Sequence, residues 1–156
     1  MEARVPAETT TLAARIGLVA VLCGAFAWAS AGASAWLSAG VGLSALLVAG
    51  RAVWPGVAIG SLWASWILGE GPELTVFGAA GATLQAVAGA ALVGRHASGR
   101  SALHTVSGVV VLFAVILSTG VVGATASTGG LVMVVQGATP ALGRAWLTCW
   151  IGNVLG

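Results

Sequence analysis

The 156-residue chain contains no lysine and no aspartate, and charged residues make up only 6% of it. The absence of lysine excludes a retinal-type Schiff base and a lysine-containing phosphate-binding loop. The absence of aspartate excludes an aspartate-based proton relay within a membrane. The two cysteines, Cys23 and Cys149, lie in apolar stretches. They are therefore predicted to be small buried hydrophobic residues and not a disulfide framework.

The few polar groups exclude further classes of function. The formal net charge of +2 is too small and too dispersed for a nucleic-acid-binding surface, so we expect no nucleic-acid partner. His96 and His104 have no carboxylate or thiolate neighbours in the sequence and are interpreted as solvated loop residues, not as a metal site. Nothing resembles a nucleophile–base pair or a pair of carboxylates. We expect no catalytic residues, no metal and no cofactor.

What the chain does contain is apolar sequence, which makes up 58% of it. Soluble domains carry about a quarter charged residues, far more than this chain has. Apolar runs near 18 residues recur along its length, as in polytopic membrane proteins. The alternation of polar and apolar residues typical of a membrane barrel is absent. The predicted fold class is all-α, a polytopic transmembrane helical bundle with five to six membrane segments.

The segments can be placed approximately on the sequence. Residues 1–11 are expected to be a polar cytoplasmic leader, and residues 12–156 the membrane domain. The expected spans are 12–31, 34–49, 53–68, 74–94 and 106–126, with a last apolar run over 145–156. Residues 127–143, rich in glycine and containing Pro140, are predicted to be a loop or re-entrant segment. The last run is shorter than the roughly 20 residues of a crossing, so we expect the chain to be cut inside a helix.

The first apolar run has a second interpretation. Arg15 precedes an apolar core, and residues 31–35 resemble the small-residue cleavage site of a signal peptide. A membrane span is favoured because further spans follow it.

The arginines predict an orientation, because cytoplasmic loops of membrane proteins retain positive charge. A cytoplasmic N-terminus puts Arg4, Arg51, Arg95 and Arg100 inside and the turn with Glu70 and Glu73 outside. Arg144 falls near the outer face on this count, or inside if residues 131–141 cross the membrane. We therefore predict a multi-pass protein of the cell inner membrane.

Residues 50–56 are predicted to form a tight inner hairpin between the second and third spans. Gly50 follows an apolar helix, where a glycine in the left-handed conformation ends helices readily. Pro55 suits the first turn of the next helix. Trp54 fits the headgroup level, and Arg51 can reach the cytoplasmic surface. Gly56 then begins a packing row.

Small residues predict close helix packing. Gly56, Gly60 and Ala64 form one row, and a second row in the fourth span comprises Gly78, Ala82, Ala86, Ala90 and Gly94. Such rows let helix backbones approach each other in lipid.

Gln85 is the strongly polar side chain within the fourth span, between Gly81 and Gly89. It is expected to face the bundle interior, either as interhelical hydrogen-bonding glue or as part of a ligand pocket. Trp63 and Trp66 belong either to an aromatic belt or to an outward-facing cage for a ligand.

Three stretches resemble the first class of membrane-associated sensor domain, the MASE1 family, over about residues 36–156. Residues 36–40, Trp-Leu-Ser-Ala-Gly, lead to Gly50-Arg51 and Trp54-Pro55-Gly56, similar to Trp-x-Pro-x-Gly before Gly-Arg-x-x-Trp-Pro-Gly. Residues 81–86, Gly-Ala-Thr-Leu-Gln-Ala, are similar to Gly-Asn-x-x-Glu-Ala. Residues 146–156 are similar to Trp-x-x-Trp-Trp-x-Gly-Asp-x-x-Gly, which aligns Trp146, Trp150, Gly152 and Asn153.

This sequence departs from the family pattern at four positions: Ser38 replaces a proline, Ala82 an asparagine, Gln85 a glutamate and Asn153 an aspartate. Two acidic positions are thus neutral amides of similar shape. Any role that requires a carboxylate there is in doubt, including recognition of a cation.

The resemblance implies a function. Such modules usually have eight spans and pass an undefined stimulus to a cytoplasmic histidine kinase or cyclic-di-GMP enzyme. We therefore expect a sensory input module embedded in lipid, compatible with a homodimer, with an output domain outside this chain. Gln85, Trp146, Trp150 and Asn153 are the predicted interior polar cluster or ligand site. The alternatives are a fragment of a small-solute transporter or channel and a purely structural anchor.

Overall fold

The structure is a computed structural model, and it describes residues 7–29, 37–96, 105–134 and 139–155. Every regular element in these ranges is helical, which confirms the predicted all-α class. The elements in chain order are α1 (Ala7–Ala29), α2 (Leu37–Ala49), a short 3-10 helix η1 (Arg51–Val53), α3 (Trp54–Ile67), α4 (Pro72–His96), α5 (Val106–Val134) and α6 (Thr139–Leu155).

Three of the described helices have the length and composition of membrane spans. They comprise Thr11–Ala29, Pro72–His96 and Val106–Val134, while Ala39–Ala49 is a shorter apolar helix. Large apolar side chains such as Trp28, Phe113 and Met133 are more than half exposed on the outside of the bundle. An outer surface so rich in large apolar side chains, in a chain with only 6% charged residues, is typical of helices in lipid. The chain is therefore a multi-pass membrane protein.

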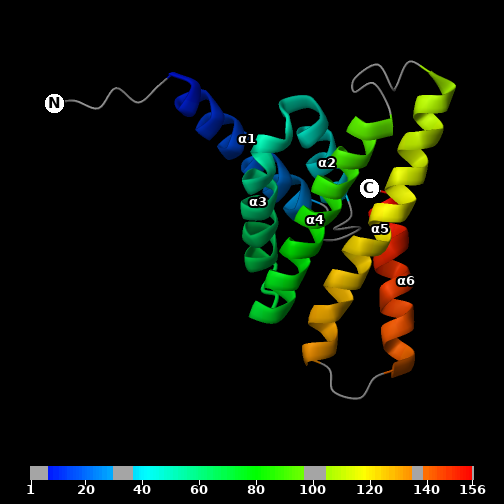
Figure 1. Cartoon of the computed structure of the whole chain (residues 1–156). Coiled ribbons are helices and arrows are strands. Elements are labelled where there is room, and N and C mark those ends of the chain that lie inside the picture. Colours follow the sequence, from blue (N-terminus) through cyan, green and yellow to red (C-terminus); the bar gives the residue numbers. More distant parts are fainter. Residues whose placement is uncertain (1–6, 30–36, 97–104, 135–138, 156) are drawn as a thin grey trace.

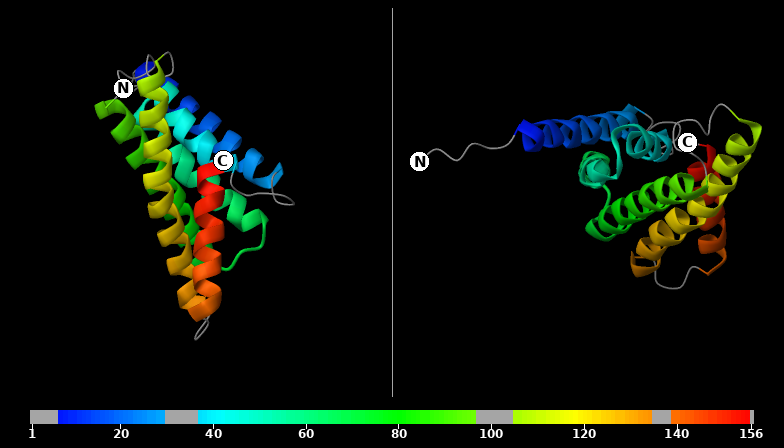
Figure 2. Two further views of the ribbon diagram at one scale, coloured as in Figure 1. Left: turned by 90° about the vertical axis from the view of Figure 1, so that its right-hand side faces the viewer. Right: turned by 45° about the horizontal axis from the view of Figure 1, so that its top comes forward.

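The six α-helices alternate in direction along the bundle (Figure 1). The turn between α2 and α3 lies at the same end as the last turn of α4, and the turn between α3 and α4 lies at the opposite end together with the end of α5. Figure 2 shows α6 alongside α5 in both views, with α1 on the far side of the bundle. The α2–α3 turn thus shares one end with Arg95, and Glu70 lies at the other.

The chain turns between α2 and α3 where the sequence predicts a hairpin. The Gly50 amide donates to the Leu46 carbonyl at 3.1 Å, and the Val53 amide donates to the Gly50 carbonyl at 3.3 Å. Pro55 lies in the first turn of α3, as predicted. Gly50 has φ 91° and ψ 162°. The predicted left-handed helical conformation is therefore wrong in ψ, and Gly50 adopts an extended region open essentially to glycine alone.

Two glycines of α3 form its contact with α1. A Cβ at Gly56 would lie 2.5 Å from the Ile16 carbonyl oxygen, and one at Gly60 would lie 2.6 Å from the Ala20 carbonyl oxygen. One turn further on, the Trp63 ring covers Gly24 of α1. The first predicted row of small residues therefore packs backbone against backbone, as membrane helices do.

The prediction for residues 127–143 is wrong over the described part of that segment. α5 continues to Val134, and α6 begins at Thr139, before the expected start at residue 145. Residues 135–138 lie outside the described ranges. Gly130 lies within α5 and makes room for Phe77, whose Cβ is 2.8 Å from the position that a Cβ at residue 130 would take. Pro140 is the second residue of α6, where its missing amide hydrogen costs no hydrogen bond.

The bounds of α5 and α6 also determine where Arg144 lies. Because α5 and α6 are both helical on either side of residues 135–138, residues 131–141 are not a separate crossing. Arg144 therefore lies near the start of α6, at the end of the bundle that carries Glu70. At the other terminus, α1 begins at Ala7, so part of the predicted leader is helical, and residues 1–6 lie outside the described ranges.

The alternating arrangement predicts the accessibility of single cysteines. In a protein with Cys23 and Cys149 changed to alanine, Gly71→Cys in the α3–α4 turn and His96→Cys at the end of α4 should react with a membrane-impermeant maleimide from opposite sides. Both native residues are exposed. Ala52→Cys in the α2–α3 turn is the matched control and should react from the same side as His96→Cys. Labelling of the Gly71 and His96 variants from one side would contradict the alternation.

Candidate functional site

The site is built on a close approach between α4 and α5, which run antiparallel. A Cβ at Gly81 of α4 would lie 3.0 Å from the Gly123 carbonyl oxygen and 3.0 Å from the Ala126 Cβ. Two turns along α4, a Cβ at Gly89 would lie 3.7 Å from the Thr119 hydroxyl. Gln85 lies between these two glycines, on the face of α4 that meets α5. Gly81 brings the α5 backbone within reach of its amide, while Gly89 makes room for Leu43 of α2, whose Cδ1 lies 2.9 Å from the position of a Cβ there.

Gln85 is buried, with 7% of its surface exposed. Its Nε2 donates to the backbone carbonyl of Asn153 on α6 at 3.4 Å. Its Oε1 is buried and accepts no hydrogen bond from any described residue. Burying a polar atom without a partner costs roughly 1–3 kcal/mol. The Gln85 amide therefore joins α4 to α6 while retaining one unsatisfied acceptor.

Gly123 of α5 creates the space in which these groups meet. Gln85 Oε1 occupies the position that a Cβ at residue 123 would take, and Asn153 Nδ2 would lie 2.9 Å from that Cβ. Any side chain at position 123 would displace both amides. We name the contact of Gln85, Gly123 and Asn153 the amide junction. Gly123 was not predicted as a site residue, because a glycine in a glycine-rich helix carries no distinctive local signal.

Trp146 and Trp150 fix α6 against α5 on the side of the amide junction. Their rings stack with centroids 6.2 Å apart and an interplanar angle of 10°. Trp150 Nε1 donates to the Leu117 carbonyl at 3.2 Å, and Trp146 Nε1 donates to the Thr125 hydroxyl at 3.1 Å. Gly120 makes room for Trp150, whose Cδ1 would lie 3.4 Å from a Cβ there. Both indoles thus bind α5.

Of the four residues predicted to form an interior polar cluster, the structure brings Gln85 and Asn153 together, whereas Trp146 and Trp150 are only partly buried and their indoles bind α5. Gln85 and Asn153 meet over Gly123, while Trp150 and Trp146 hold the same face of α6 onto α5. Gly152, next to Asn153, is buried.

The residues of the turn motif lie elsewhere, at the α2–α3 end of the bundle. Arg51 Nη2 would lie 3.1 Å from a Cβ at Gly94, beside the C-terminal turn of α4. A cation there is stabilised by the negative end of the helix dipole. The turn motif is thus separate from the polar cluster.

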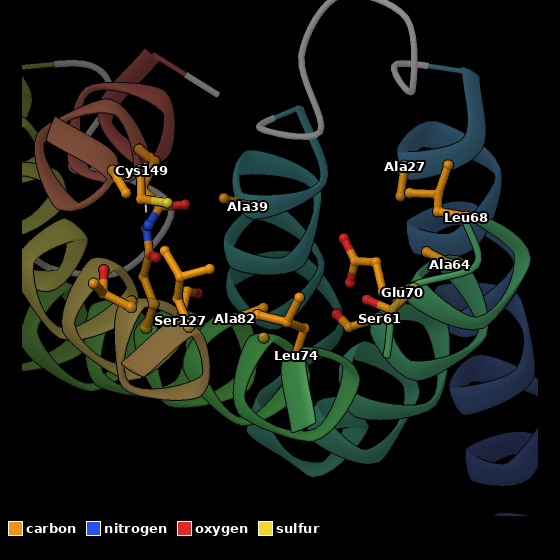
Figure 3. Close-up of a pocket in the computed structure, with 18 residues that line it drawn as sticks. Ala27, Ala39, Ser61, Ala64, Leu68, Glu70, Leu74, Ala82, Ser127 and Cys149 are labelled. Atoms are coloured by element: carbon orange, nitrogen blue, oxygen red, sulfur yellow. Dashed lines mark hydrogen bonds between the residues drawn. The ribbon is translucent and has the colours of Figure 1, made fainter. Parts of the chain in front are cut away.

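A cavity of about 300 Å³ adjoins the amide junction. It lies among α3, α4, α5 and α6, with Ala27 of α1 and Ala39 of α2 also lining it (Figure 3). Its polar lining residues are Ser61, Ser65, Glu70, Gln85, Ser127, Thr128 and Asn153. In Figure 3 the labelled Cys149 and Ser127 lie at one side of the cavity, and the Glu70 carboxylate lies between α4 and the end of α3. Neither Glu70 nor the serines were predicted as site residues.

Comparison with protein families gives one match, in which the family model of MASE1 covers residues 10–156. The chain belongs to the MASE1 family. MASE1 is a family of membrane-associated sensor domains, so this chain is a sensory membrane module. No curated protein and no solved structure matches the chain.

Two departures of this MASE1 chain from the family pattern fall in the amide junction. Gln85 stands where the pattern has glutamate, and Asn153 where it has aspartate. Gln85 uses an N–H group to reach the Asn153 carbonyl, and an ionised glutamate has no such donor. The neutral amide therefore makes an α4–α6 hydrogen bond that an ionised glutamate at position 85 would not make.

Among the described residues, none of the tryptophans or histidines singled out in the sequence of this MASE1 chain lines the cavity. Trp63 is 43% exposed and Trp66 is 74% exposed, and neither lines the cavity. His96 Nδ1 lies 3.1 Å from the Leu92 carbonyl, and His104 lies outside the described ranges. Within the described ranges no cluster of metal-ligating residues occurs.

Both cysteines are unpaired, and they differ in burial. Cys23 is 1% exposed, as predicted. Cys149 is only partly buried, so the prediction of a buried residue is wrong there, because its helix face borders the cavity.

Proposed function

We propose that this MASE1 domain is the input module of a signalling protein and passes a stimulus to a cytoplasmic output domain, either a histidine kinase or a cyclic-di-GMP enzyme. The observation that carries the proposal is the amide junction beside the cavity. In this junction a 3.4 Å hydrogen bond joins α4 to α6 beside Gly123 of α5. Gln85 Oε1 has no hydrogen-bond partner among the described residues. Because one buried acceptor is unsatisfied in this arrangement, we infer that other arrangements of the two amides have a similar free energy.

The mechanism is a shift between two packings of α6 against α4 and α5. A ligand in the cavity or a change in the bilayer stabilises whichever packing it contacts more favourably, and the populations follow that difference. The difference must amount to a few kcal/mol to move the equilibrium substantially. Asn153 donates no side-chain hydrogen bond to Gln85 Oε1 in this packing, so a second packing that forms this bond is within reach of a small movement of α6.

A sensory role fits the lining of the cavity better than catalysis does. Among its described lining residues there is one carboxylate, one thiol and no histidine, arginine or lysine. General acid–base and nucleophilic catalysis need a paired base or acid within hydrogen-bond reach. The lining supports binding without chemical conversion, and we propose that the chain is not an enzyme.

The proposed orientation has the N-terminus in the cytoplasm of the cell, with the domain in the inner membrane. Arg51 and Arg95 lie at the bundle end that this orientation puts inside, and Glu70 and Glu73 at the opposite end. Retention of arginine in cytoplasmic loops supports it. A homodimer remains compatible with this arrangement.

The reading frame beyond Gly156 tests the proposal. We expect further membrane spans followed by a domain with a phosphoacceptor histidine or with a Gly-Gly-Asp-Glu-Phe-type motif. Determining the downstream coding sequence is sufficient. A frame that continues only into spans related to the first six, without an output domain, would instead support a transporter.

Substitutions in the amide junction test the mechanism in the full-length protein. Gln85→Leu and Asn153→Leu should each reduce stimulus-dependent output at least about tenfold, because about 1.4 kcal/mol of lost coupling has that effect. Output is measured as kinase autophosphorylation or cyclic-di-GMP formation. Thr83→Val is the matched control on α4, because the Thr83 hydroxyl donates only to the Ala79 carbonyl of its own helix. Normal output from a well-expressed Gln85→Leu protein would reject the mechanism.

A further inference from the structure

The cavity next to the amide junction is lined mainly by small and apolar side chains, with a few polar groups among them. Besides Glu70 it presents the hydroxyls of Ser61, Ser65 and Ser127 and the amide of Gln85. No arginine or histidine of the described residues lines it, and the stretches 30–36 and 135–138 contain no charged residue. Among the described lining residues the one formal charge is therefore negative, and the hydroxyls and amides can accept as well as donate hydrogen bonds.

Glu70 is the source of this charge. Its backbone is fixed by two contacts: its amide donates to the Ser65 carbonyl at 3.1 Å, and its carbonyl accepts from the Thr75 hydroxyl at 3.4 Å. No ion pair of its carboxylate is found within the described ranges. Glu70 lines the cavity from an exposed position at the end of the bundle, and a cleft whose charge is of one sign attracts an ion of the opposite sign.

The lining also distinguishes between kinds of cation. No aromatic side chain is among the described lining residues, so these residues offer a quaternary ammonium group no ring face to bind. A primary ammonium group has three N–H donors and needs acceptors. Hydroxyl oxygens supply them, and Gln85 Oε1 is an acceptor without a partner in a side chain that is 7% exposed. The volume of about 300 Å³ is at the lower end of the range for small-molecule pockets.

We infer that this cavity is a binding site for a small primary ammonium compound, with its charge near Glu70 and its N–H donors directed to the acceptors between α3, α4 and α5. The inference names the ligand class of the proposed sensor and rests on the proposed function for its link to signalling. Ligand binding and output are measured separately, so either can fail alone.

Cys149 provides the measurement, because it lines the same cavity, whereas Cys23 is buried in the α1–α3 contact. In a Cys23→Ala full-length protein in liposomes, Cys149 is the thiol to be followed. Methanethiosulfonates modify it when its thiolate displaces methanesulfinate and forms a mixed disulfide. The rates of the aminoethyl (cationic) and sulfonatoethyl (anionic) reagents are each divided by their rates with a free thiol in solution. The neutral methyl reagent reports access.

We expect the normalised rate of the cationic reagent to exceed that of the anionic reagent by about tenfold. Glu70→Gln should remove most of this preference. Glu73→Gln is the matched control, because it removes a negative charge from the same turn at a residue that does not line the cavity. Equal rates for the two charged reagents, or the same loss of preference in both variants, would overturn the inference. So would failure of the neutral reagent to react, because the cavity would then be filled.

A protection experiment on Cys149 tests the same binding site without any substitution of a charged residue. Millimolar ethylammonium should slow modification of Cys149 by the neutral reagent, and ethanol and tetramethylammonium should not. Protection by tetramethylammonium equal to that by ethylammonium would refute recognition through N–H donors. Normal protection in a protein whose output ignores ethylammonium would establish the binding site and refute its link to signalling.

Discussion

The close approach of α4 and α5 through facing glycines is the contact on which the rest of the structure depends. In lipid there is no hydrophobic force between helices, so dispersion and hydrogen bonds must hold them, and both require short distances. Gly81 and Gly123 provide those distances on opposite helices. Because Gly123 has no side chain, Gln85 can reach across α5 to α6. The order of α4, α5 and α6 in the bundle follows from this contact.

The same contact explains why a cavity forms beside it. α6 is held to α5 by Trp150 and to α4 by one amide, while α3 is held to α1 by Gly56 and Gly60. α3 and α4 also pack on each other through a shared core that includes Val57 and Ala86. The cavity lies beyond that core and is lined by small side chains and a few polar ones. A sensory membrane module needs a binding site and a helix contact that can respond to binding. The cavity and the amide junction beside it are suited to these two roles.

The sequence alone predicts the elements of this fold that depend on local chemistry. Long apolar runs predict the helices, and Gly50 with Pro55 predicts the hairpin, because each residue acts within its own turn. Gln85 is predicted to face inwards because glycines flank it by one turn on either side. Residues 127–134 were misjudged because glycine is a poor helix former in isolation and Pro140 follows closely. Here Phe77 packs on Gly130, and the Thr128 hydroxyl bonds to the Ala124 carbonyl.

The missed residues of the site are those whose role depends on other helices. Gly123 is important only because Gln85 of α4 and Asn153 of α6 meet beside it. In the sequence, Glu70 is simply part of an acidic turn, and its place at the cavity depends on residues of α4 and α5. Neither relation has a signature within a short window of sequence. The resemblance to the family pattern did indicate Gln85 and Asn153, because that pattern covers positions that lie far apart in the chain.

The thermal stability of Gly123→Ala in detergent, compared with Gly129→Ala, tests the central claim most directly. Both glycines lie in α5, but a Cβ at Gly129 would meet only the Phe77 ring at 3.8 Å, whereas one at Gly123 would displace both amides. We expect Gly123→Ala to lower the midpoint of unfolding by roughly 3–10 °C, from about 1–3 kcal/mol of overpacking. Gly129→Ala should leave the midpoint unchanged or raise it slightly, because alanine favours a helix. Equal midpoints for the two variants would contradict the account.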